Sequence, residues 1–129
     1  MIYETILPAK TFSYEKISTT IQKDPNLVAG QVAKEITDLI FNNQKNNKQT
    51  VLGLATGKTP KNIYKELIRF YQNKKISFKN VICFNLDEYY ALGSGSNKSY
   101  RQYMYENLFQ HIDIEPSNCF IPQGNIEQH

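Results

Sequence analysis

The chain has 129 residues, of which 40% are hydrophobic and 21% charged, so it is long enough for one domain with a core but short for two. Its net charge of +3 and pI of about 8.8 are lower than those typical of nucleic-acid-binding domains. No apolar run approaches the length needed to span a membrane. Two cysteines and two histidines are too few for a metal cluster. We therefore expect no nucleic acid, membrane or metal as a partner.

The beginning of the chain carries little structural information. Met1 to Thr5 lack the charged stretch followed by an apolar stretch that marks a secretory signal. Cys83 lies inside an apolar run, as a small buried side chain would. Both features favour a reducing, cytoplasmic setting. Residues 1–24 show no clear period, so we expect an N-terminal arm or extension there and a folded unit over residues 25–129.

Helices and strands alternate along the rest of the chain. Asp24-Pro25 is typical of an N-cap followed by the first helical residue, and a helical spacing of apolar residues then runs to about Phe41. Further helices are expected from Pro60 to about Tyr71 and around residues 100–108. Strands are expected at 51–54, 81–86 and 119–121, with 81–86 buried on both faces. This order predicts an α/β fold, a Rossmann-like parallel-sheet sandwich with right-handed crossovers.

A glycine turn comes directly after the first of these strands. The segment Thr56-Gly57-Lys58-Thr59-Pro60 lies between strand and helix, where backbone N–H groups and the helix N-terminus favour an anion. Its spacing differs from the nucleotide-binding G-x-x-x-x-G-K-[ST] loop, because three residues rather than four separate Gly53 from Gly57. The loop therefore favours a monophosphate held by residues 56–59. The alternatives are that Thr59 only caps the helix and Gly57 only turns the chain.

Two acidic residues come after the second strand. Asp87 and Glu88 stand directly beyond the apolar run 81–86. In a parallel sheet the carboxyl ends of both strands lie at one edge, so the glycine loop and Asp87 should be neighbours. A partly desolvated carboxylate there is suited to act as a general base on a small phosphorylated substrate. The alternative is that these acids cap a turn or pair with a surface lysine.

The glycine loop, the acidic segment and several later motifs carry a family resemblance. The runs 52–60 (LGLATGKTP) and 84–90 (FNLDEYY) resemble glucosamine-6-phosphate deaminase, as do Ser99-Tyr100, the run 108–114, the turn 116–118 and the run 121–124. The resemblance covers about residues 28–125, with the motifs in order. Related 6-phosphogluconolactonases carry Asp-Glu-Arg where this chain has Asp87-Glu88-Tyr89, which favours the deaminase side.

The resemblance implies specific roles and no organic cofactor. The family converts glucosamine 6-phosphate and water to fructose 6-phosphate and ammonia. Asp87 matches its general base, which moves a proton between C2 and C1. Thr56, Gly57, Lys58 and Thr59 match its phosphate-binding loop, although Lys58 replaces the usual Gly or Ser. Glu88 and Tyr89 match residues that shape the site.

The family's second catalytic stretch, a glycine-rich turn with Asp-Gly-His and then a Glu, cannot be placed in this chain. Neither can its remaining phosphate-binding Arg and Lys. We therefore expect the N-terminal half of a deaminase-like domain, inactive alone, with an exposed apolar sheet surface. The other functions left open are a non-catalytic sugar-phosphate-binding module, a 6-phosphogluconolactonase-like hydrolase and a short nucleotide-binding loop. A homo-oligomer also stays open.

Overall fold

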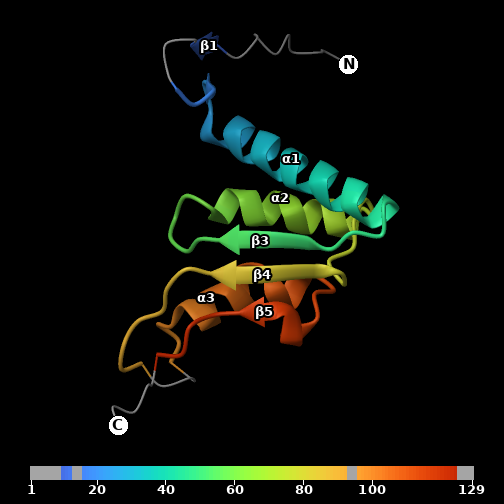
Figure 1. Cartoon of the computed structure of the whole chain (residues 1–129). Coiled ribbons are helices and arrows are strands. Elements are labelled where there is room, and N and C mark those ends of the chain that lie inside the picture. The colour runs from blue at the N-terminus through green and yellow to red at the C-terminus, as the bar shows by residue number, and fades with distance from the viewer. Residues whose placement is uncertain (1–9, 13–15, 93–95, 125–129) are drawn as a thin grey trace.

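A computed structural model describes residues 10–12, 16–92 and 96–124 of the chain, shown in Figure 1. Its centre is a parallel sheet of three strands in the order β3-β4-β5, formed by Thr50–Leu54, Val81–Asn85 and Cys119–Phe120. A separate antiparallel pair, β1 (Lys10–Phe12) and β2 (Thr19–Ile21), lies within the segment expected to be an arm. The predicted α/β class and parallel sheet are confirmed.

Three helices connect and flank these strands. They are α1 (Pro25–Lys45), α2 (Lys61–Gln72) and α3 (Tyr100–Asn107). The predicted start of α1 is confirmed, because the Asp24 carboxylate accepts the N–H of Asn26 at 2.7 Å and Pro25 takes the first helical position. Short 3-10 turns at Phe109–His111 and Pro116–Asn118 lead from α3 into β5. None of the described helices is long and apolar enough to cross a membrane.

The core lies between the sheet and a layer formed by all three helices (Figure 1). Leu52, Leu54, Val81 and Cys83 project into it from the strands. The helices contribute Ala33 and Ile40 from α1, Tyr64 and Leu67 from α2, and Met104 from α3, and Leu108 follows directly after α3. Only part of the apolar spacing expected up to about Phe41 forms the buried face of α1. Leu27, Val28 and Leu39 are exposed, and the smaller Ala29, Ala33 and Thr37 face the core, because α1 packs closely against α2.

The opposite face of the sheet carries exposed apolar side chains. Val51 is 58% exposed, Phe84 44% and Phe120 47%, and the rings of Phe84 and Phe120 stack with centroids 4.8 Å apart. The prediction that strand 81–86 is buried on both faces is therefore wrong, because β4 alternates between buried and more exposed residues. The expected exposure of apolar sheet surface is confirmed. We call the residues Val51, Ile82, Phe84 and Phe120 the open face.

The last described residues are hydrogen-bonded to the segment that follows β4. Gly124 accepts a hydrogen bond from the N–H of Ala91 at 2.8 Å through its carbonyl. A Cβ at Gly124 would lie only 2.5 Å from the carbonyl oxygen of Tyr89 and 3.1 Å from that of Leu92. Glycine is therefore required here by close approach between two backbone segments.

We expect Gly124→Ala to lower the free energy of unfolding by about 1–3 kcal/mol, the usual cost of an overpacked contact. Gly30→Ala is the control, since a Cβ at Gly30 meets no atom within 4 Å and alanine favours the helix by up to about 1 kcal/mol. Urea unfolding monitored by circular dichroism measures both. Equal stability of Gly124→Ala and the parent chain would contradict the close approach.

Candidate functional site

The parallel register brings the glycine loop and the acidic segment to the same edge of the sheet. Leu54 is the partner of Asn85 in the last pair of β3 and β4, so both strands end level with one another. The Asn85 side-chain amide donates to the carbonyl of Leu54 at 3.1 Å and ties the two ends together. In Figure 1 the loops after β3 and β4 leave the sheet on the same side. The neighbourhood predicted from the sequence is therefore present.

The glycine loop has the conformation that the sequence predicts for a tight turn. Gly57 has φ of +104°, a left-handed value that side chains rarely adopt. Helix α2 begins after Pro60 without a side-chain cap, so Thr59 does not cap the helix and that alternative is wrong. Within the described part of the chain, the N–H groups of Gly57, Lys58 and Thr59 donate no hydrogen bond. These three donors at a helix N-terminus are available to an anion.

Helix α3 holds the glycine loop from the side. The Tyr103 hydroxyl donates to the carbonyl of Gly57 at 2.5 Å, and the Lys61 ammonium lies 5.5 Å from the centre of the Tyr103 ring. On the α2 side, the Tyr64 hydroxyl hydrogen-bonds the carbonyl of Ala55, just before the loop. Burial raises the pKa of both phenols, so each keeps its donor proton at neutral pH. The loop is thus fixed at its beginning and at its turn.

The Glu88 carboxylate binds the N-terminus of α3. It accepts the N–H groups of Tyr100 at 2.8 Å, Arg101 at 3.0 Å and Tyr89 at 2.9 Å. Partial burial raises the pKa of this carboxyl, but the three hydrogen bonds and the Arg101 charge outweigh it, so the net pKa is lowered. Ser99 adds an N-cap by accepting the N–H of Gln102 at 3.1 Å. Glu88 therefore joins the segment after β4 to the first turn of α3.

Tyr89 and Tyr100 meet beside the acidic segment. Their ring centroids are 4.6 Å apart, and their planes are tilted by 42°. The pKa of the Tyr100 phenol is raised overall, first by the neighbouring Tyr89 and then by burial, and the nearby Thr56 and Asp87 also act on it. Tyr100 thus lies next to members of both segments. The sequence indicated only a helix around residues 100–108, and the contacts of Tyr100 and Tyr103 with the acidic segment and the glycine loop were not predicted.

Asp87 is placed at the expected edge but in a different environment. Its side chain is exposed, whereas the sequence predicted partial desolvation at the strand end. Leu86 beside it is 85% exposed, so the described part of the chain leaves this segment open to solvent. Lys58 and Thr59 are exposed as well. Asp87 and the glycine loop therefore lie on a solvent-exposed edge of the described structure.

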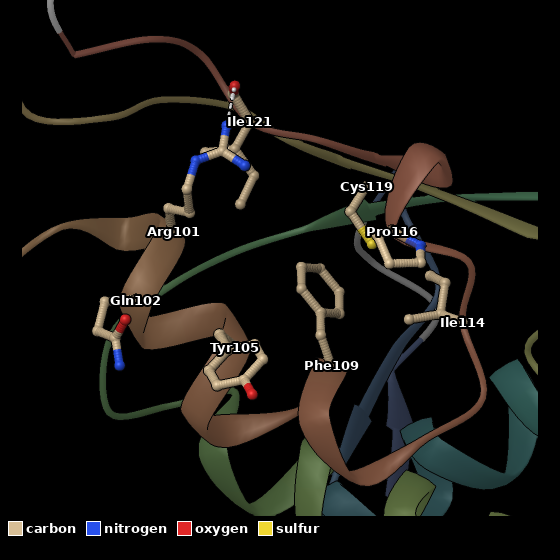
Figure 2. A pocket seen from close by; sticks show the side chains of 8 residues that line it. All are labelled: Arg101, Gln102, Tyr105, Phe109, Ile114, Pro116, Cys119 and Ile121. Carbon is tan, nitrogen blue, oxygen red and sulfur yellow. Dashed lines mark hydrogen bonds between the residues drawn. The ribbon is translucent and has the colours of Figure 1, made fainter. Parts of the chain in front are cut away.

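A pocket of about 440 Å³ lies elsewhere, between α3 and β5 (Figure 2). Its lining includes Tyr105, Phe109, Cys119 and Ile121, and none of the candidate site residues. Arg101 spans its rim by donating to the carbonyl of Ile121 at 3.2 Å. We call it the edge pocket. Its lining is mostly apolar, so it differs in chemistry from the loop.

The parallel sheet and its crossover helices define an α/β protein with a glycine loop before a helix N-terminus, at the carboxyl edge of its strands. A family model described as glucosamine-6-phosphate isomerases/6-phosphogluconolactonase matches residues 23–128. The chain therefore belongs to this family.

Curated relatives and solved structures agree with that assignment. The glucosamine-6-phosphate deaminase of Mycoplasma mycoides is 50% identical over 96 residues, covering 74% of this chain and 39% of the relative. The Caenorhabditis elegans deaminase is 42% identical over 109 residues, covering 84% and 41%. The structure of a monomeric glucosamine-6-phosphate deaminase superposes with a TM-score of 0.77 at 40% identity, covering 83% of this chain and 43% of that one.

A 6-phosphogluconolactonase from Plasmodium vivax shares the fold, with a TM-score of 0.68 at 24% identity. The match covers 88% of this chain and 39% of the lactonase. The chain spans about two fifths of the length of the Mycoplasma mycoides and Caenorhabditis elegans deaminases. It is thus homologous to part of a deaminase.

We expect Glu88→Gln to lower the free energy of unfolding at pH 7 by roughly 0.5–2 kcal/mol, the range for loss of a helix N-terminal cap. The pKa of Glu88 in the folded state lies below the ordinary value of about 4.3. The carboxylate therefore adds to the free energy of unfolding above about pH 4.3, and this stabilisation is lost as the pH falls through the folded-state pKa. The difference from the parent chain should therefore shrink at acid pH. Urea unfolding at pH 7 and below pH 4 tests this, with the exposed Glu115→Gln as control. A difference independent of pH would contradict the role of the carboxylate charge.

Proposed function

We propose that this chain supplies the phosphate-binding loop and the enolisation base of a glucosamine-6-phosphate deaminase. The observation that carries the proposal is the common edge: three free N–H donors at the start of α2 and the Asp87 carboxylate beyond β4 lie beyond paired strand ends. A sugar phosphate held by its phosphate at Gly57, Lys58 and Thr59 would extend its carbon chain along this edge. The homology to deaminases supports this substrate class.

Each candidate residue takes one role in this proposal. Gly57, Lys58 and Thr59 bind the phosphate through N–H groups, and the Lys58 ammonium and Thr56 hydroxyl add charge and a hydrogen bond. Asp87 takes the proton from C2 of the ring-opened sugar and returns it to C1 through an enolamine, which leaves an imine at C2. Water then adds to C2 and ammonia leaves, which gives the ketose. Glu88 and Tyr89 position the segment through α3.

The exposed site supports the further proposal that the chain alone turns over slowly or not at all. Enzymes exclude water to strengthen the electrostatic interactions that stabilise a transition state, and Asp87 lies in solvent here. Ring opening also needs an acid–base group that the described residues do not place beside Asp87. Binding of substrate is therefore the first property to measure, and proton exchange the second.

Titration of the isotopically labelled chain with glucosamine 6-phosphate should shift the backbone amide signals of Gly57, Lys58 and Thr59 in a saturable manner. Glucosamine without phosphate should leave these signals in place. Gly57→Val should abolish the effect, because a β-branched residue is strained at a φ of +104° and the loop would change its conformation. ATP with Mg²⁺ is the competing ligand. Saturable shifts with ATP but not with the sugar phosphate would favour a nucleotide loop and overturn the proposal.

Tyr103→Phe should weaken binding of glucosamine 6-phosphate about three- to tenfold, because the loop loses its hydrogen bond from α3 to the Gly57 carbonyl. Tyr105→Phe on the same helix is the matched control, since Tyr105 is 53% exposed and lines the edge pocket instead. The dissociation constant is measured by calorimetry. Equal weakening by both variants would show that the effect is not specific to the loop.

Asp87→Asn should leave phosphate binding unchanged and remove solvent exchange of the C2 proton, because an amide does not accept that proton. Nuclear magnetic resonance of substrate in deuterated water measures the exchange, and coupled detection of ammonia measures deamination. Binding without exchange in the parent chain would favour a non-catalytic sugar-phosphate-binding module. Ammonia release by the isolated chain at an ordinary enzymatic rate would contradict the proposal that it turns over slowly or not at all.

A further inference from the structure

Cys83 and Cys119 lie opposite one another on neighbouring parallel strands. They are the two cysteines of the chain, and each is the register partner of the other between β4 and β5. Both side chains pack on the core side of the sheet. Neighbouring strands are about 4.8 Å apart, and disulfides join residues whose Cα atoms are about 4.4–6.8 Å apart. The register therefore places two free thiols at a backbone distance that suits a disulfide.

The two thiols differ in how easily a reagent reaches them. Cys83 is 1% exposed, whereas Cys119 is half-buried and lines the edge pocket, as Figure 2 shows. Burial raises the pKa of Cys83 to about 12, and the nearby Cys119 thiol adds to this shift, which agrees with their pairing in the sheet. A small soluble reagent can thus reach Cys119 from the pocket, and Cys83 lies behind it as the second thiol.

Strand β5 is the partner that can adjust. It has two residues and lies at one edge of the three-stranded sheet, so two register pairs hold it to β4. The Cys119 thiol donates a weak hydrogen bond to the carbonyl of Glu115 at 3.8 Å, which costs little to give up. The Cβ atoms of a disulfide approach to about 3.8 Å, somewhat closer than the strand spacing. A short edge strand can supply this small movement.

We propose that Cys83 and Cys119 form a reversible intrachain disulfide between β4 and β5. The oxidant is a small soluble disulfide, such as glutathione disulfide. The Cys119 thiolate attacks one sulfur of the oxidant, which releases one thiol and leaves a mixed disulfide on Cys119. The Cys83 thiol then loses its proton and attacks the Cys119 sulfur, which releases the second thiol. Two protein thiols are thereby oxidised, and one glutathione disulfide is reduced to two glutathione molecules.

The bond closes a ring that contains the acidic segment and α3. Both lie between β4 and β5 in the chain, so residues 83 to 119 form the ring. A cross-link of this kind restricts the unfolded chain more than the folded one and so favours folding. It also holds the short β5 on the sheet. The disulfide is a property of the sheet and does not depend on the proposed function.

The test equilibrates the chain with mixtures of glutathione and glutathione disulfide at pH 8, followed by an acid quench. Mass spectrometry and peptide mapping should show a monomer that has lost two hydrogen atoms and contains a linked Cys83–Cys119 peptide pair. The equilibrium position gives the effective concentration of the two thiols. We expect this concentration to be at least tenfold higher in the folded chain than in urea. Linkage then requires the oxidised chain to have an unfolding constant lower by the same factor, which urea unfolding measures.

Two single variants are the matched controls. Cys83→Ser should stop at the mixed disulfide, with one glutathione on Cys119, and Cys119→Ser should stay largely unmodified because Cys83 is buried. In the parent chain, glutathione on Cys119 with Cys83 still a thiol would overturn the proposal. So would a disulfide-linked dimer, or two thiols that stay reduced at every glutathione ratio. An effective concentration no higher in the folded chain than in urea would show that the register does not favour the bond.

Discussion

The hydrogen bond from the Asn85 amide to the Leu54 carbonyl, at the last register pair of β3 and β4, is the contact from which the candidate site is built. It keeps the carboxyl ends of β3 and β4 in register, directly before the glycine loop and the acidic segment. A shift of one residue in this register would also move the buried side chains of a strand to the opposite face. The register that buries Leu52 and Cys83 is therefore the one that brings the loop and Asp87 to the same edge.

Helix α3 fixes the positions of the glycine loop and the acidic segment relative to one another. It has only eight residues, too few for a stable isolated helix, so its position depends on tertiary contacts. Glu88 holds its first turn through two of its N–H groups, and Tyr103 reaches from its middle to the carbonyl of Gly57. The helix thereby links the acidic segment to the loop. This coupling explains why residues that contact no phosphate are expected to affect phosphate binding.

The distribution of helices gives the molecule two unlike faces. One face of the sheet packs under three helices and holds the core, and the other leaves a stacked pair of phenylalanines in solvent. An exposed apolar patch of this kind marks an interaction surface or an aggregation hazard. The same openness leaves Asp87 in water. Solvent exposure is thus common to the open face and to the segment that carries Asp87.

Much of this architecture was determined by the sequence itself. The spacing of apolar residues, which changes between a helical and a strand-like period along the chain, predicted the helices and strands. It could do so because this spacing and cap residues such as Asp24 act locally. The glycine turn and Asp87 were found because parallel strands share a carboxyl edge. The apolar spacing did not identify which residues of α1 are buried, since the small Ala29 and Ala33 face the core where α1 packs against α2.

Tertiary structure alone decided the remaining features. No local pattern indicates that the Glu88 carboxylate binds a helix twelve residues further along, or that Tyr103 donates to Gly57, because such partners meet only after the crossover has closed. The exposure of Phe84 likewise depends on which side the helices occupy. The sequence thus determined the elements and their order, whereas packing determined which polar atoms meet and which apolar face stays open.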